Sequence, residues 1–258
     1  MEKKNKKRLQ FLLAILFWVA VWQVGSMAVR QVLLLPSPID TLRALASLVF
    51  TSVFWGSVFN SLWHIALGFF MGLLLGIILG VIAAWKNAVA VLLRPLMQLM
   101  LAVPVASYVV LLLIWGGSAW LSTYIGLLLV LPVIYNNMLV GIGQVNGQLL
   151  EMARLFHIPF WRRVRAIYLP ALRPSLLSAM QLSIGLSWKS GVAAEVMGVT
   201  TGTIGYRLYQ AKIYLQMPEM FAWTVMIVLV SWLFAKLTIA VTRRLLAWIE
   251  RGWGRWQT

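Results

Sequence analysis

The chain reads EMARLFHIP at residues 151–159 and IYLP at residues 167–170, and these two stretches bound a basic island between long apolar runs. Glu151 is the only acidic residue between Asp40 and Glu195. The chain of 258 residues is 62% hydrophobic and only 11% charged. This composition is far too apolar for a soluble domain and indicates an integral membrane protein. We therefore expect the island to lie outside the lipid, where another molecule can bind it.

Uncharged runs on both sides of the island predict membrane-spanning helices, because a helix needs about 20 mainly apolar residues to cross the hydrocarbon core. The stretch 95–150 carries no charge and is long enough for two spans, with a break at Gly116-Gly117-Ser118. Hydrophobicity that is continuous rather than alternating favours helices over a barrel. The sequence thus predicts an all-α membrane protein with six transmembrane helices, drawn from the runs 11–28, 57–84, two within 95–150, 174–198 and 221–242.

Lysine and arginine predict the orientation, since cytoplasmic loops carry an excess of both. If the N-terminus is cytoplasmic, 16 of these residues fall on its side and four, Arg30, Arg43, Arg207 and Lys212, on the other. Both termini and the island are then cytoplasmic. The expected division is a basic N-terminus at 1–10, a first transmembrane helix at 11–29, an external segment at 30–55, a transmembrane core at 56–245 with a cytoplasmic loop at 144–171, and a cytoplasmic tail at 246–258.

The first apolar run admits two interpretations. Its lysine-rich start and the small residues near its end are also typical of a cleavable signal peptide. The run is long for such a peptide, so we predict an uncleaved helix. Beyond it, Pro36-Ser37-Pro38 interrupts any helix, and Asp40 is expected to cap a short external helix over 41–50.

Several functions find no support in the sequence. There is no cysteine, and two histidines and six carboxylates are scattered singly, so no metal or cofactor site is expected. No G-x-x-x-x-G-K-[ST] loop occurs, and any ATP with its Mg must therefore bind another chain. The net charge of +16 sits at the ends of apolar runs rather than on one aromatic-laced face, which argues against a nucleic-acid partner.

Four glycines recur at four-residue spacing in the second span and put a small-residue face on that helix. Such a face favours close packing against a neighbouring helix. Prolines at 104 and 132 predict kinks, which are tolerated where neighbouring protein satisfies the backbone. The glycines expected to pack are Gly68, Gly72, Gly76 and Gly80.

Charged and hydroxyl residues interrupt the run at 174–198. Lys189 and Glu195 would each be costly if they faced lipid, and a separation of six residues puts them about 120° apart, so they do not pair within the helix. We predict that this span borders a translocation pathway; a Glu195 that simply meets water near the external end is the alternative. The residues expected to line the pathway are Ser183, Ser187, Lys189, Ser190 and Glu195.

The island is predicted to fold as two short helices. Asn146 is a good cap for a helix over 147–156, and a second helix covers 160–169, with Pro159 between them. Each helix has an apolar stripe, and the arginines of the second helix point elsewhere. Such a pair suits a groove on a cytosolic partner. An amphipathic loop bound to anionic membrane lipid is the alternative that the residues leave open.

Glu151-Met152-Ala153, followed at the expected distance by Ile167-Tyr168-Leu169-Pro170, resembles the EAA loop of bacterial ABC-importer permeases. Further landmarks between about Asn60 and Trp248 are similar to the nitrate/sulfonate/taurine branch of that family. Met152 and His157 depart from the family pattern, which has alanine and glycine there. Glycine permits a turn with positive φ that histidine tolerates less easily, so we expect a reshaped turn at His157.

The resemblance implies a type I ABC-importer permease, a non-enzymatic multi-pass subunit of the bacterial cytoplasmic membrane. It implies three partners: a second permease copy in a homodimer, a cytosolic ATPase that holds ATP and Mg, and an external substrate-binding protein. The solute would be a nitrate-, sulfonate- or taurine-like anion or a vitamin precursor. An ATP-independent carrier or channel is the alternative. The implied ATPase-coupling residues are Glu151, Met152, Ala153, Arg154, His157, Pro159, Ile167, Leu169 and Pro170.

Overall fold

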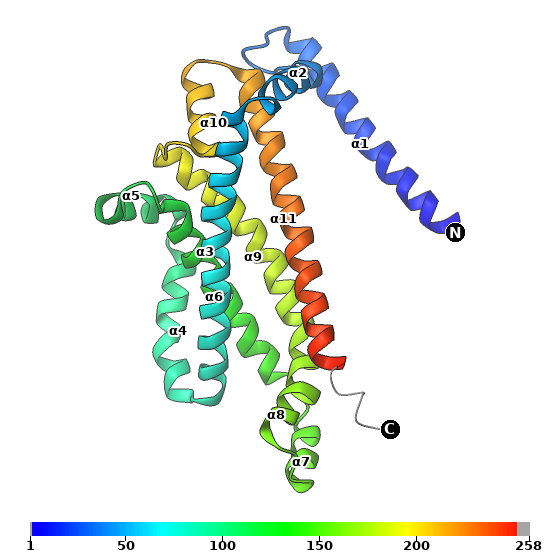
Figure 1. Cartoon of the computed structure of the whole chain (residues 1–258), viewed down its shortest axis with the longest axis vertical. Helices are drawn as coiled ribbons and strands as arrows, with labels where there is room; N and C mark the ends of the chain where they lie inside the picture. The colour runs from blue at the N-terminus through cyan, green and yellow to red at the C-terminus, as the bar shows by residue number, and fades with distance from the viewer. Residues whose placement is uncertain (1, 252–258) are drawn as a thin grey trace.

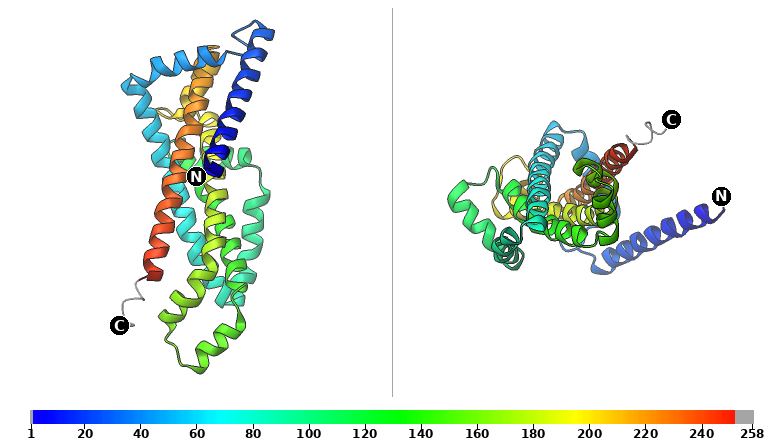
Figure 2. Two further views of the ribbon diagram at one scale, coloured as in Figure 1. Left: turned by 90° about the vertical axis from the view of Figure 1, so that its right-hand side faces the viewer. Right: turned by 90° about the horizontal axis from the view of Figure 1, so that it is seen from below.

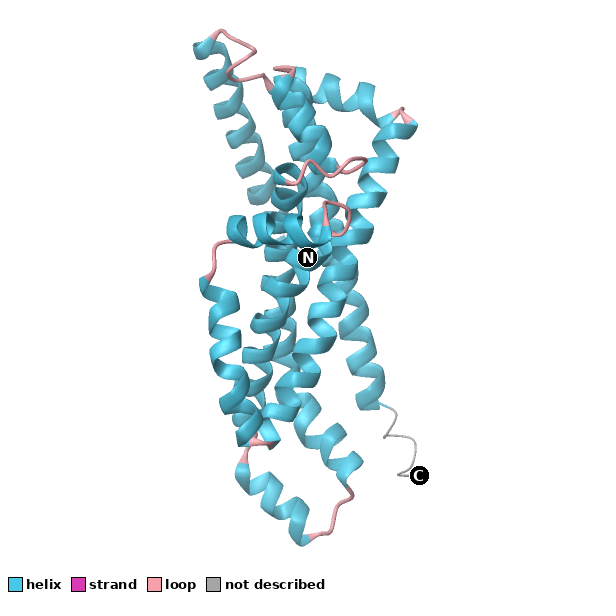
Figure 3. Cartoon of the chain, turned by 90° about the vertical axis from the view of Figure 1, so that its left-hand side faces the viewer, coloured by secondary structure: helices cyan, strands magenta, loops and turns pink. Residues whose placement is uncertain are grey.

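The structure, a computed structural model, describes residues 2–251; Met1 and residues 252–258, which hold more than half of the expected tail at 246–258, lie outside the described residues. Within that range the regular elements are all helices, joined by short turns (Figure 3). Their bounds are α1 Glu2–Val29, α2 Pro38–Val49, α3 Ser52–Trp85, α4 Asn87–Ala102, α5 Val105–Gly116, α6 Leu121–Gly143, α7 Gly147–Leu155, α8 Phe160–Arg163, η1 Val164–Tyr168, α9 Leu169–Met197, α10 Ile204–Ile213 and α11 Met217–Arg251.

α1 leans away from the elongated bundle that the other long helices form (Figures 1 and 2). No residue of its apolar segment 12–29 is buried. The helix is attached near its end, where the Trp22 ring stacks on Phe221 of α11 with 5.8 Å between centroids, and where Ser26 Oγ donates to the Leu35 carbonyl at 3.0 Å. Almost all of its apolar surface is therefore left for contacts outside this chain.

α3 and α6 pack with their backbones close together, and the glycine face of α3 makes this approach possible. A Cβ on Gly72 would lie 2.8 Å from the Val130 Cβ, and one on Gly76 would lie 2.8 Å from the Ile134 Cβ. Real side chains do not approach so closely. Gly68 and Gly80 meet α6 in the same way, one turn before and one turn after. The four-residue spacing thus matches one continuous contact line along α6.

Aromatic rings join α3, α9 and α11 into one core. Phe54 of α3 stacks on Trp223 of α11 at 4.8 Å between centroids. Further along the bundle, Phe234 of α11 meets both Phe69 at 5.8 Å and the buried Trp188 of α9 at 6.1 Å. Ring pairs at these separations add to the free energy gained from burying their area.

Four described helices are long and apolar enough to cross a membrane: α1, α3, α6 and α11. α4 and α5 would make a fifth span, but they meet at an angle of 102°. The sequence led us to expect one kinked helix from about residue 95; instead α4 begins at Asn87 and the chain breaks at Val103-Pro104. Val103 is extended, as residues before proline generally are, and this conformation ends α4.

α9 is not among these apolar helices, because Arg173, Lys189 and Glu195 lower its hydropathy. It nevertheless lies in the middle of the bundle, packed against both α6 and α11. The buried positions of α9 are therefore covered by protein.

The short helix α2 begins earlier than expected, at Pro38 rather than at residue 41. Its cap is Ser37, which corrects the assignment of that role to Asp40. Ser37 Oγ accepts the Asp40 N–H at 3.1 Å, and Asp40 Oδ2 accepts the Ser37 N–H at 3.3 Å. This reciprocal pair is a capping box, in which the acidic residue stands at the third helical position.

Candidate functional site

α7 and α8 project beyond one end of the bundle (Figure 1). We call residues 147–168 the elbow. α7 starts because the Asn146 side chain accepts the N–H of Gln148 at 2.9 Å, as an N-cap does. The helix ends at Leu155, one residue short of the expected range. The start of α7 is thus fixed by a side chain of its own segment.

His157 forms the turn between the two parts of the elbow, and it does so with a φ of 49°. The His157 N–H donates to the Arg154 carbonyl at 3.0 Å, and the Ile158 N–H donates to the Ala153 carbonyl at 2.9 Å. These two bonds are the Schellman pattern that usually has glycine at the left-handed position. The turn expected to be reshaped by histidine therefore keeps a glycine-like conformation.

Large apolar side chains are exposed on the elbow. Leu155 is 78% exposed, Phe156 75% and Trp161 73%. Glu151 and Met152 are exposed on the same short helix, while Ala153 is fully buried. Exposed apolar groups of this size beside a carboxylate are characteristic of a surface that binds protein.

The elbow connects directly to the transmembrane helices. Phe160 contacts Trp85 at the end of α3, with 5.5 Å between ring centroids. α8 passes through the π-helical turn η1 into α9 without a loop, so Ile167 lies in the π turn and Leu169-Pro170 open α9. The second helix expected over 160–169 is therefore the first part of one helix that reaches Met197. Because no loop separates them, a displacement of the elbow would also move the start of α9.

Glu195 lies at the other end of α9, fully buried. Its Oε2 accepts a hydrogen bond from Ser61 Oγ of α3 at 2.7 Å and another from the Gly205 N–H of α10 at 3.1 Å. A buried carboxylate is tolerated when donors of this kind reach it; both reach Oε2, whereas Oε1 has no hydrogen-bond partner among the described residues. Glu195 therefore joins three helices rather than standing in open water.

Ser183, Ser187 and Ser190 are also buried, inside the bundle. Ser190 Oγ donates to the Leu186 carbonyl at 2.6 Å. Lys189 differs from these residues because it lies on the exposed face of α9. Of the five residues expected to line a pathway, four therefore meet other helices of this chain, and only Lys189 points outward.

Sequence reasoning missed the partners of Glu195. Neither Ser61 nor Gly205 stands out in the sequence as a partner of a buried carboxylate. A Cβ on Gly205 would lie 2.7 Å from the Val196 backbone nitrogen, so the close approach of α10 to α9 depends on this glycine. The contact of Ser61 cannot be recognised from the nearby sequence, because Ser61 and Glu195 are 134 residues apart. Within residues 2–251, no three histidine or acidic side chains form a group that could hold a metal ion.

Comparison with known proteins gives a consistent result. Residues 72–251 match the family of binding-protein-dependent transport system inner membrane components. The chain is 31% identical to the putative aliphatic sulfonates transport permease protein SsuC of Escherichia coli, over 92% of this chain and 88% of that protein. It is 29% identical to the SsuC protein of Bacillus subtilis, over 96% and 91%. The taurine transport system permease protein TauC of E. coli is 26% identical, over 88% and 84%.

Two solved structures share the fold. A chain of a bacterial alginate ABC transporter, crystallised with an alginate-bound periplasmic protein, has a TM-score of 0.57 at 15% identity; the match covers 94% of this chain and 97% of that one. A chain of an amino acid ABC transporter crystallised with histidines has a TM-score of 0.52 at 18% identity and coverage of 80% and 97%.

Proposed function

The chain belongs to the family of binding-protein-dependent transport system inner membrane components and is the permease subunit of an ABC importer in the bacterial cell membrane, and we propose that its elbow couples transport to a separate ATPase subunit. The observation that carries the proposal is the exposed apolar surface of Leu155, Phe156 and Trp161 on a helical segment continuous with α9. Family membership also favours an importer over an ATP-independent carrier.

The orientation that this coupling needs is supported by the distribution of charge along the bundle. The elbow carries Arg154, Arg162, Arg163 and Arg165, whereas α2 and α10 at the opposite end carry Arg43, Arg207 and Lys212 (Figure 1). The denser basic group belongs on the cytoplasmic side. The elbow then faces the cytosol, and six spans follow if α4–α5 and α9 each cross the membrane.

The working transporter would contain two copies of this chain, two ATPase subunits that hold ATP and Mg, and an external binding protein. Nucleotide binding closes the ATPase pair, the two elbows move with it, and each elbow tilts the α9 to which it is joined. The pathway between the permease copies then changes the side on which it is open. This scheme couples two sites through an element with two states.

We place the pathway on the exposed face of α9, where Gln181, Gly185 and Lys189 recur at four-residue spacing. These side chains are polar or small, which suits water better than lipid. Lys189 supplies a positive charge there. The substrate proposed is a small organic anion of the sulfonate type, since the relatives named above include sulfonate and taurine permeases.

The coupling proposal is tested by Glu151→Lys in the complete transporter. The new charge replaces the single carboxylate of α7, so we expect the ATPase to co-purify poorly and uptake to fall at least tenfold while the chain still inserts into the membrane. Glu219→Lys makes the same change in the first turn of α11 at the opposite end, and should leave the ATPase bound. Unaltered co-purification of the ATPase with the Glu151 variant would overturn the proposal.

A further inference from the structure

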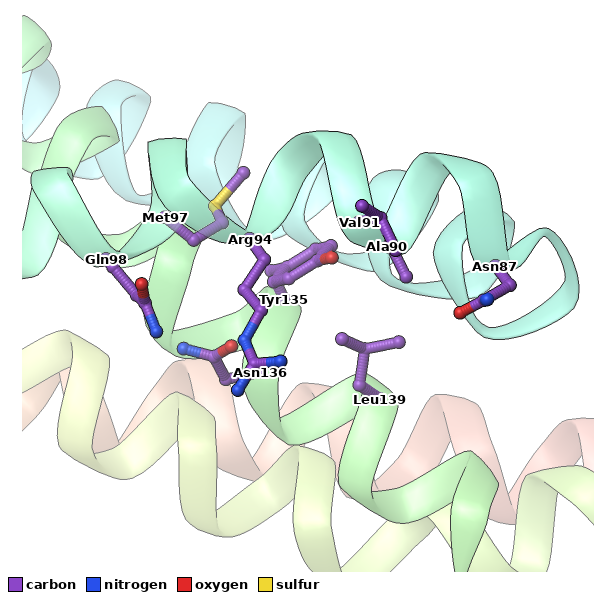
Figure 4. A pocket seen from close by; sticks show the side chains of 9 residues that line it. All are labelled: Asn87, Ala90, Val91, Arg94, Met97, Gln98, Tyr135, Asn136 and Leu139. Atoms are coloured by element: carbon purple, nitrogen blue, oxygen red, sulfur yellow. The ribbon is translucent and has the colours of Figure 1, made fainter.

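A cavity of about 470 Å³ lies between α4 and α6, away from the elbow and from the face of α9 that carries Lys189. Its volume is in the range of small-molecule sites. In Figure 4 the side chains of Arg94 and Gln98 extend from α4 towards α6, which carries Asn136 and Tyr135. The polar groups in the cavity wall include a guanidinium, which only donates hydrogen bonds, and three side-chain amides, the third from Asn87, each of which has an NH2 donor.

The charge of the cavity is unbalanced. Its nine lining residues include one arginine and no aspartate or glutamate. Arg94 stands seven residues into α4, about 10 Å along the helix from its start at Asn87. A guanidinium at such a depth in a spanning segment is costly unless an anion or water accompanies it. The wall therefore offers a positive charge whose partner is not among the residues that line it.

Tyr135 gives a second, independent observation. Its side chain is only 1% exposed, and its hydroxyl has no hydrogen-bond partner among the described residues. Buried hydroxyl groups are nearly always hydrogen-bonded, so an unpaired one in a cavity wall indicates a missing ligand or water. Within residues 2–251, neither the exposed Arg94 guanidinium nor the buried Tyr135 hydroxyl has a hydrogen-bond or ion-pair partner, and both residues line this cavity.

We propose that this cavity binds an oxoanion, a phosphate or sulfonate group, with Arg94 as its charged ligand and Gln98 and Asn136 as amide donors. Arginine suits this role because its planar fork of N–H groups matches two oxygens of such a group. A lipid headgroup in the same leaflet or a soluble sulfonate could supply the oxoanion. The site does not depend on coupling to an ATPase, because binding can be measured without ATP.

The test uses the full-length chain in lipid nanodiscs and measures its thermal unfolding midpoint. One series compares discs of phosphatidylcholine with discs that contain increasing phosphatidylglycerol. The other adds propanesulfonate to discs of phosphatidylcholine. A ligand that binds the folded state raises the midpoint. We expect one of the two probes to raise it in the wild type, and Arg94→Gln to need at least about tenfold more of that probe, as loss of one charge-assisted contact predicts.

Arg43→Gln is the matched control, since it removes the same charge from the exposed external helix α2 and should respond as the wild type does. Asn136→Ala keeps the arginine and should weaken the response about threefold or more; it carries the test if Arg94→Gln does not fold. A response confined to phosphatidylglycerol assigns the site to lipid, and one confined to propanesulfonate assigns it to a soluble sulfonate. If neither variant differs from the wild type with either probe, the oxoanion site is refuted.

Discussion

Ser61 on α3 and Glu195 on α9 meet inside the bundle, where the serine hydroxyl donates to the carboxylate at 2.7 Å. The same hydroxyl oxygen accepts the Ile204 N–H at 2.9 Å, and the carboxylate accepts the Gly205 N–H. Both N–H groups belong to the first turn of α10, whose partial positive charge favours a carboxylate. One serine and one glutamate therefore attach α10, at the end of the bundle opposite the elbow, to two long helices.

Ser61→Ala should lower the free energy of unfolding by about 1–3 kcal/mol, because the buried Ile204 N–H loses its acceptor and Glu195 loses a donor. Thermal or denaturant unfolding in nanodiscs measures the change. Ser47→Ala on the exposed face of α2 removes a hydroxyl bonded only within its own helix and should stay within about 0.5 kcal/mol of the wild type. Equal stability of the two variants would contradict the role given to Ser61.

Gly76→Ala and Gly56→Ala should act in opposite directions, although both glycines lie in α3. A Cβ on Gly76 would meet the Ile134 Cβ at 2.8 Å and the Leu131 carbonyl oxygen at 2.9 Å, so α3 and α6 must separate, at a cost of about 1–3 kcal/mol. Gly56 has nothing within 4 Å, and alanine there should stabilise the helix by about 0.5–1 kcal/mol. Two losses of similar size would mean that the α3–α6 contact is not the cause.

His157→Gly should stabilise the elbow by about 1 kcal/mol, since glycine adopts the observed φ of 49° without the steric cost that other residues have. His157→Val, which places a β-branched side chain there, should destabilise it. Hydrogen exchange at the Ile158 N–H, which closes the turn, reports the local effect directly. A glycine variant that exchanges faster than the wild type would exclude a simple conformational cost at this position.

The features that the sequence predicted well are local ones. Asn146 caps α7 through an amide only two residues away, and the glycine spacing of α3 belongs to one helix, so both can be recognised without knowing the fold. Resemblance to a family supplied the permease identity. The capping serine of α2 was missed because Asp40 is an equally good cap by residue type, and only the backbone decides between Ser37 and Asp40.

The missed features depend on contacts distant in sequence. Pro104 indicates a kink, but the 102° angle between α4 and α5 depends on how each helix packs against α6. Arg94 looked like an ordinary cytoplasmic charge, because its relation to Asn136 appears only when α4 lies along α6. In the same way, Ser183 and Ser187 looked like a polar stripe along a pathway, and the fold places them inside the bundle.

Lys189→Gln tests the proposed pathway. Lys189 lies on the exposed face of α9, and if it attracts the anion in transit, its neutralisation should slow taurine uptake by cells that express the complete transporter about tenfold, equivalent to about 1.4 kcal/mol. Lys189→Arg keeps the charge and should retain most of the uptake.

Lys236 is the second lysine within a span and serves as the control. Its Nζ lies over the Trp232 ring, 4.8 Å from the centroid, and this ring stabilises the charge within the protein. Lys236→Gln should therefore leave uptake within about twofold, because no step assigned to the anion involves that charge. If the two glutamine variants slow uptake equally, the effect is not specific to Lys189. The pathway then does not lie along the exposed face of α9.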